Sequence, residues 1–482
     1  MRHLARAAVA AAMALPIAAA VAAPQPATPI PGPLSGPLPP YAGAPVAARP
    51  LPGPFPRANP VLAPDGRSGS GLAAGNGGAS PLAGPLGVAT TSASALEFGT
   101  CASLAFDAKG RLLAVCNGPM GPALRLIDPV SLATIATLTL PARNSPDRTD
   151  LAGGTHYVVR ADGTLLVPTN SRTLITVTVD PDALRQTGVV SLDKVLRSGE
   201  RPFAVGAGYD GRDWVAGNQG TVVAIPRGHG AMQSIALKEP VAEDIATAPS
   251  GTYVVTSAAL YRLRADADGK PRVVWRQPLL SALADSHAGR VHAGPGTPPA
   301  IVPGGYVAVA DAMAPPRITV VRIAGRAARR LMCAVPVFKP GSGSIEAQLV
   351  VAGHSILAAN AYGYDNPAST EGGNTTTGGL ARITVDRHGC HRSWTSKEIS
   401  PSAQPVVSRA TGLLYTLEKP HGAPDAWNLA ALDWRTGQKR FAVLAGEGLG
   451  YNSEGGAIAL GPDGSAYAGT FGGVVRFHDG KP

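Results

Sequence analysis

The chain has 482 residues, a net charge of +10 and 45% hydrophobic residues, with 59 Gly and 46 Pro but only 5% aromatic residues. The few aromatic residues are not interleaved with the basic ones, so this composition argues against a nucleic-acid-binding surface. No segment after the N-terminal region has the run of 18 uncharged apolar residues typical of a membrane-spanning helix, so we expect no transmembrane segment in the mature chain.

Residues 1–22 have the pattern of a secretory signal peptide. Arg2 and Arg6 make the start basic, an apolar stretch follows from Ala7, and Ala20-Val21-Ala22 forms an Ala-x-Ala cleavage site. A membrane anchor is the alternative, but the apolar run is short for a bilayer core of about 30 Å. The sequence therefore predicts an exported protein, periplasmic or extracellular.

Residues 23–85 are rich in Pro, Gly and Ser. Proline removes backbone donors and favours extended chain, and the Gly/Ser-rich part from residue 66 is typical of flexible segments. We expect a disordered linker here, either a spacer through the cell envelope or a tail without a function of its own.

Eight turn signals recur at regular intervals after residue 100, each between two short apolar runs. They lie at residues 107–110, 161–163, 209–211, 248–251, 302–305, 351–354, 409–412 and 462–464. Gly and Asp tolerate the positive φ that hairpin turns require, and repeats of about 48 residues are typical of propeller blades. The sequence predicts an all-β fold over residues 86–482, a single β-propeller of eight four-stranded blades. A seven-bladed ring and an array of β-sandwiches are the alternatives.

The last repeat ends at Phe477 without room for an outer strand. Propellers often close by taking that strand from the other end of the domain. Residues 86–96, which precede the first blade, are β-compatible and are the candidate for the closing strand.

The four cysteines predict two disulfides in an exported chain. If Asp107 pairs with Gly110 across the first turn, Cys101 falls opposite Cys116. Cys333 and Cys390 then remain, in the fifth and sixth blades. Four buried thiols are the alternative.

The segment Ala431-Leu432-Asp433-Trp434-Arg435-Thr436-Gly437, followed by Phe441, resembles the docking motif of quinoprotein propellers, which locks neighbouring blades. Phe441 stands where that motif has Trp. More broadly, residues 98–482 are similar to a family of secreted bacterial propeller proteins of unassigned function. The resembling stretches are 101–107, 389–396 and 449–452. This resemblance implies fold and compartment but no quinone cofactor, because the chain has no adjacent cysteine pair.

Polar groups just before each innermost strand are expected to converge on the central channel. These are His156, Gln404 and the carboxylates Glu243, Asp244, Glu346 and Glu454. Carboxylate oxygens suit hard cations, so Ca²⁺ is the candidate metal at the four acids, although no cofactor is firmly predicted. Lactone-hydrolysing propellers resembling gluconolactonase use such a channel metal, but the Asn ligands typical of them are missing here. A metal-dependent lactonase or esterase is the alternative function.

The segment 362–379 is a long loop rich in Gly, Asn and Thr, with Tyr362, Tyr364, Asn366 and Asn374 as candidate binding residues. Loops on a rigid scaffold commonly carry binding functions. The chain has no Gly-x-Ser-x-Gly, His-Glu-x-x-His or phosphate-binding loop motif. The leading hypothesis is therefore a binding or scaffold module of the cell envelope. An envelope protein, a glycan and a small molecule are the candidate partners, and the oligomeric state stays open.

Overall fold

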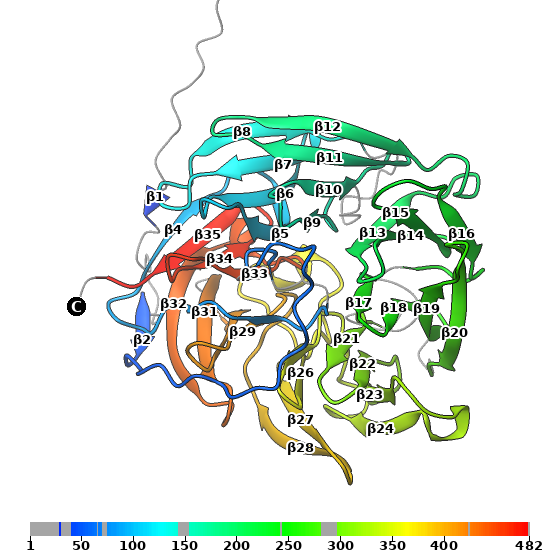
Figure 1. The fold of residues 1–482 in the computed structure, drawn as a ribbon. Coiled ribbons are helices and arrows are strands. Elements are labelled where there is room, and N and C mark those ends of the chain that lie inside the picture. The colour runs from blue at the N-terminus through cyan, green and yellow to red at the C-terminus, as the bar shows by residue number, and fades with distance from the viewer. Residues whose placement is uncertain are drawn as a thin grey trace, which may run out of the picture.

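A computed structural model describes residues 28–29, 40–64, 66–69, 75–142, 154–241, 243–280, 296–422 and 425–480. Eight antiparallel sheets are arranged around a central axis as a β-propeller, which confirms the predicted fold and selects eight blades over seven (Figure 1). All eight predicted turns connect the first and second strands of a blade. No helix among these residues is long and apolar enough to cross a membrane, and the predicted signal peptide lies outside them.

The first four blades follow in chain order from the innermost strand to the outermost. Blade 1 contains β5 (Thr100–Phe106), β6 (Leu112–Gly118), β7 (Gly121–Ile127) and β8 (Thr134–Thr139). Blade 2 contains β9 (Val158–Val159), β10 (Leu165–Pro168), β11 (Thr173–Val179) and β12 (Leu184–Ser191). Blade 3 contains β13 (Pro202–Ala207), β14 (Arg212–Gly217), β15 (Thr221–Pro226) and β16 (Gln233–Ala236). Blade 4 contains β17 (Ala246–Ala248), β18 (Gly251–Val255), β19 (Ala259–Ala265) and β20 (Pro271–Pro278).

Blades 5 to 7 repeat this order, with short 3₁₀ turns in two loops. Blade 5 contains β21 (Ala300–Val302), β22 (Tyr306–Ala310), β23 (Arg317–Arg322), the turn η1 (Ala327–Arg329) and β24 (Leu331–Pro336). Blade 6 contains β25 (Val350–Ala352), β26 (Ser355–Ala359), η2 (Pro367–Thr370), β27 (Leu380–Asp386) and β28 (Gly389–Ser396). Blade 7 contains β29 (Val406–Ser408), β30 (Leu413–Glu418), β31 (Ala426–Asp433) and β32 (Lys439–Glu447).

Blade 8 is closed by a strand from the N-terminal side of the domain. After η3 (Leu449–Tyr451), the chain forms β33 (Ile458–Leu460), β34 (Ala466–Gly469) and β35 (Val474–His478). The fourth strand is β4 (Thr91–Ala95), which pairs antiparallel with β35 from Val474↔Ala95 to His478↔Thr91. The predicted closing strand is therefore confirmed, and β1 (Thr28–Pro29) adds a short strand outside it.

Both disulfides form as predicted. Cys101 and Cys116 are paired residues of β5 and β6 and are bonded to each other. The second bond joins Cys333 to Cys390, which lie on the outer strands β24 and β28 of neighbouring blades. The first bond fastens one hairpin, whereas the second links blade 5 to blade 6.

Tryptophan side chains lock two pairs of neighbouring blades. The Trp394 ring of blade 6 lies against Gly437 of blade 7, and its Nε1 donates to the Trp434 carbonyl at 3.0 Å. Trp275 of blade 4 donates in the same way to the Ile323 carbonyl of blade 5, at 3.1 Å. The segment that resembles the quinoprotein docking motif therefore receives a Trp from the preceding blade. Phe441, which replaces Trp within the segment, stacks against Tyr41.

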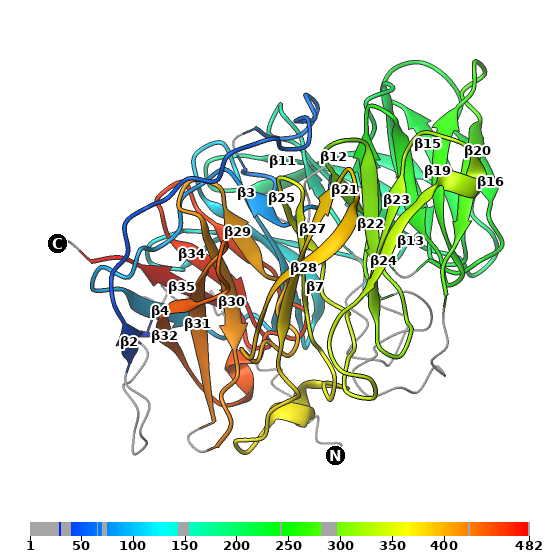
Figure 2. The ribbon, with the colours of Figure 1, turned by 90° about the horizontal axis from the view of Figure 1, so that it is seen from below.

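The largest difference between prediction and structure concerns the segment predicted as a disordered linker. We call its described residues 40–64, 66–69 and 75–85 the N-terminal strap. The strap packs on the ring instead of extending away from it (Figure 2, blue). Its strand β2 (Tyr41–Gly43) pairs with β32, and β3 (Ala79–Ser80) runs parallel to β29. Leu62 is 6% exposed, and Leu51 and Phe55 pack against the core between blades 6 and 7.

The strap hydrogen-bonds to innermost-strand segments of seven blades. The pairs are Phe106 N with Arg67 O, Ala63 N with Val159 O, Asn59 Nδ2 with Ala207 O, Asn76 Nδ2 with Ile245 O, Ile301 N with Gly75 O, Val351 N with Gly77 O and Val407 N with Gly78 O. The inner edge of an innermost strand otherwise presents unpaired backbone groups. Small residues permit this approach: Gly69 has a φ of +76°, and an added Cβ would collide with the Leu104 carbonyl.

Candidate functional site

The predicted carboxylates lie on the face of the ring where the innermost strands begin. Glu243 and Asp244 precede β17, Glu346 precedes β25, and Glu454 precedes β33. We call this end of the ring the acidic face. The strap lies mainly toward the opposite face, although its Asn76 reaches the Ile245 carbonyl just before β17. The yellow helical turn of η2 projects from the acidic side (Figure 2).

Glu346 and Asp244 lie close enough to Glu243 to affect its ionisation. Glu243 is 8% exposed. Burial raises its pKa well above the ordinary value, and the charges of Glu346 and Asp244 raise that pKa further. Negative charge from blades 4 and 6 is therefore concentrated at this face, at a cost to the ionised form.

His156, predicted to face the channel from blade 2, forms an ion pair with Asp244, with 3.0 Å between Nδ1 and Oδ2. Its ring also packs against Phe203 of blade 3, with 4.6 Å between ring centroids. Burial opposes the charged imidazole, but the Asp244 carboxylate outweighs burial and raises the pKa of His156. This contact joins blades 2, 3 and 4 at the acidic face.

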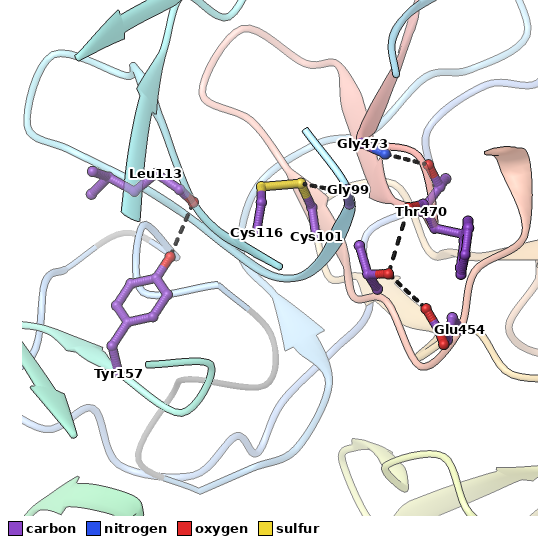
Figure 3. Close-up of a disulfide and its surroundings, with 10 residues drawn as sticks. Gly99, Cys101, Leu113, Cys116, Tyr157, Glu454, Thr470 and Gly473 are labelled. Atoms are coloured by element: carbon purple, nitrogen blue, oxygen red, sulfur yellow. Dashed lines mark hydrogen bonds between the residues drawn. A yellow bond between two sulfur atoms is a disulfide. The ribbon is translucent and has the colours of Figure 1, made fainter. Parts of the chain in front are cut away.

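Glu454 lies on the other side of the ring, beside the first disulfide (Figure 3). It accepts a hydrogen bond from Thr100 Oγ1 at 2.7 Å, so blade 8 is joined to the start of blade 1. Gln404 of blade 7 donates to the Gly455 carbonyl at 3.0 Å. These polar groups tie blades together as well as lining the face.

The loop between β26 and β27, residues 360–379, crosses from blade 6 toward blade 8. Tyr364 is 4% exposed and donates from its hydroxyl to Asn452 Oδ1 at 2.8 Å. Asn452 in turn donates to Thr370 Oγ1 at 2.8 Å, and Thr375 Oγ1 donates to the Lys419 carbonyl of blade 7 at 2.6 Å. Hydrogen bonds to two further blades therefore fix this loop.

The four candidate binding residues of the loop fall into two groups. Tyr364 holds the loop against blade 8, and Asn366 caps η2 by accepting a hydrogen bond from Ala368 N at 2.9 Å. Asn374 is exposed and Tyr362 is half-buried, so these two residues present side-chain surface to the solvent. Asn452 is the centre of the network. It lies in the stretch 449–452 that resembles the propeller family, but nothing in that stretch marked it as a site residue.

The predicted metal ligands do not assemble into a metal-binding group in the part of the chain that the structure describes. There, no three His, Cys, Asp or Glu side chains lie close enough together to hold an ion. Glu454 belongs to the Thr100 contact, on the blade 8 side of the ring. Innermost strands of consecutive blades begin next to each other, which is why their preceding carboxylates were expected to converge. The sequence alone does not determine the direction in which each carboxylate side chain points.

The comparisons with known proteins support the fold. No family model matches the chain. An uncharacterised protein of Archaeoglobus fulgidus is 28% identical over 330 residues, which cover 60% of this chain and 63% of that protein. The chain thus spans less than two thirds of this relative's length.

Among solved structures, quinohemoprotein alcohol dehydrogenase from Comamonas testosteroni matches with a TM-score of 0.54 and 12% identity, over 87% of this chain and 81% of that one. BamB from Moraxella catarrhalis matches with a TM-score of 0.50 and 13% identity, over 80% and 98%. The chain has a quinoprotein-like β-propeller fold. At these identities the likeness extends to the fold alone.

Proposed function

We propose that this protein is an exported ligand-binding propeller of the cell envelope, with the acidic face as its binding surface. The single observation that carries the proposal is the contrast between the two ends of the ring. The strap binds innermost-strand segments of seven blades and lies mainly toward one end, and carboxylates from blades 4, 6 and 8 precede the innermost strands at the other end. The signal-peptide pattern and the two disulfides support export.

The ligand's chemistry follows from the charges at that face. A buried carboxylate such as Glu243, whose pKa is raised by burial and by the charges of Glu346 and Asp244, is costly to keep ionised, and a cationic partner group relieves that cost. A protonated amine, on a small molecule or on a basic segment of an envelope protein, therefore fits the surface. Asn374 and Tyr362 of the 360–379 loop provide further polar contacts.

Isothermal titration calorimetry with spermidine tests the cationic preference, and titration with Ca²⁺ tests the metal-dependent hydrolase as the alternative. We expect spermidine binding that releases protons at neutral pH, because a bound cation favours the ionised form of Glu243. The double substitution Glu243→Gln, Glu346→Gln should weaken binding at least tenfold, and Glu371→Gln, on the exposed part of the loop, should not.

Stoichiometric Ca²⁺ binding that is lost in the double variant, together with lactone hydrolysis, would favour the hydrolase instead. Binding of neither probe would contradict a cation-binding face.

A further inference from the structure

The two densest basic runs of the sequence meet at one corner of the ring, between blades 4 and 5. The guanidinium of Arg330 lies 5.0 Å from the centroid of the Trp275 ring, and Arg262 Nη1 donates to the Ile323 carbonyl at 3.0 Å. Figure 1 shows the outer strands β20 and β24 on the same side of the ring. Arg262 also donates to the Ser250 carbonyl, in the turn where β17 ends, so the corner lies toward the strap face.

The charge of this corner is not neutralised by nearby carboxylates. We define the arginine corner by six side chains: Arg262, Arg264, Arg322, Arg326, Arg329 and Arg330. None of the six forms an ion pair with a carboxylate in the described residues, and residues 312–345 contain no Asp or Glu. The neighbouring Asp266 is already paired with Arg272.

Several arginines of blades 1 to 3 are paired with carboxylates. Asp213 binds both Arg160 and Arg227, and Arg111 pairs with Asp107. The corner therefore differs from these sites, because its six arginines are clustered and have no carboxylate partner in the described residues.

Exposed aliphatic side chains accompany the arginines. Val273 and Val274 on β20 are 39% and 45% exposed, and Leu331 at the start of β24 is 49% exposed. These are three of the seven large hydrophobic side chains that are exposed in the described part of the chain. Aliphatic groups between unpaired arginines suit a surface that is anionic at its boundary and apolar beneath it.

We propose that the arginine corner docks the propeller onto an anionic lipid membrane. Each Arg near such a surface contributes about 1 kcal/mol, and the aliphatic side chains bury apolar area at the headgroup boundary. A nucleic acid is disfavoured, because the corner has no exposed aromatic residues on which bases could stack. Docking through this corner directs the acidic face away from the lipid, because its carboxylates are repelled by the same charges.

Vesicle co-sedimentation of the mature, disulfide-bonded protein tests the proposal. Vesicles containing phosphatidylglycerol should bind it, binding should fall as salt is raised, and vesicles of phosphatidylcholine alone should not bind it. The double substitution Arg326→Glu, Arg329→Glu should weaken binding more than tenfold. Arg387→Glu, Arg440→Glu is the matched control, because it makes the same charge change at exposed positions of blades 6 and 7.

Three further results test the assigned surface and its partner. Val274→Ser, Leu331→Ser should weaken vesicle binding while keeping its salt dependence, and unchanged affinity would overturn insertion of these side chains. Equal losses in the corner and control variants would overturn the assigned surface. Binding of soluble polyglutamate without vesicle binding would overturn the membrane in favour of an acidic protein partner.

Discussion

The two ends of the propeller axis are built from different chemistry. At the strap face, mostly main-chain hydrogen bonds join a Gly- and Pro-rich segment to the innermost strands, with side-chain bonds from Asn59 and Asn76 in two blades. At the acidic face, side-chain contacts such as His156 with Asp244 and Thr100 with Glu454 join neighbouring blades. One end is thus specified by backbone geometry and serves stability, whereas the other concentrates charge at a cost, as functional surfaces do.

Removing the strap should produce the largest effect. Deletion of residues 24–85 keeps β4 but leaves the inner edges of seven blades without their strap partners. We expect the free energy of unfolding to fall by about 5 kcal/mol or more, because roughly ten hydrogen bonds at about 1 kcal/mol each are partly offset by the ordering entropy of the segment. Denaturant unfolding measures this.

Deletion of residues 24–39 is the control, because it leaves the strap intact and, among the described residues, removes the β1 pairing. It should cost about 1 kcal/mol at most. Equal stability of the two deletion variants would show that the strap is dispensable.

A matched pair of glycine substitutions separates close packing from backbone strain. Gly69 and Gly163 have φ of +76° and +85°, but only at Gly69 would a Cβ meet another part of the chain. Gly163→Ala should cost about 1 kcal/mol, and Gly69→Ala about 3 kcal/mol, because the strap must also move from β5. Thermal unfolding compares them, and equal losses would contradict a tightly seated strap.

Replacing Glu243 at the acidic face with a neutral residue should increase stability, whereas the changes to the strap decrease it. The folded protein holds the Glu243 proton more tightly than the unfolded chain does, since burial and then the charges of Glu346 and Asp244 raise its pKa. The associated stability is complete below the ordinary pKa of about 4.3 and is lost as pH rises toward the folded-state pKa. Glu243→Gln should therefore raise Tm by about 2–4 °C near pH 7, as expected for about 1 kcal/mol.

Near pH 4 the advantage of Glu243→Gln should disappear. Thermal unfolding between about pH 4 and pH 8 measures this dependence. A Gln variant that is less stable than the wild type at neutral pH would contradict a costly acidic face.

The smallest expected effect concerns the loop 360–379. Tyr364→Phe removes the hydroxyl that donates to Asn452 and should cost about 1 kcal/mol, with faster hydrogen exchange in that loop. Tyr306→Phe, at the start of β22 in blade 5 and toward the strap face, is the control and should leave exchange of the loop unchanged.

The blades were predictable because turn chemistry and apolar strands repeat locally. The turn at residues 107–110 predicts the hairpin that carries Cys101 and Cys116, but the strands pair Phe106 with Leu112, and a β-bulge between Cys101 and Ser103 brings Cys101 opposite Cys116. Residues 91–95 close the ring where the last repeat lacks a strand. The strap was not predictable from the same signals. Residues such as Gly75, Gly77 and Gly78 bind through their carbonyl groups, so they show no hydrophobic period and resemble a linker in composition.

The candidate site was only partly predictable. Strand starts identified Glu243, Asp244, Glu346 and Glu454 as lying on one face, but side-chain direction depends on loop geometry that no local pattern encodes. Tyr364 was identified from its loop, whereas its partner Asn452 comes from a segment 88 residues later.

Hydrogen exchange at three backbone amides tests the strap most directly. The N–H groups of Ile301, Val351 and Val407 donate to the strap carbonyls of Gly75, Gly77 and Gly78. If the strap is an integral part of the propeller, these amides exchange as slowly as those inside the central strand β22. Exchange at the rate of an exposed turn such as Gly325 would contradict a strap-closed ring.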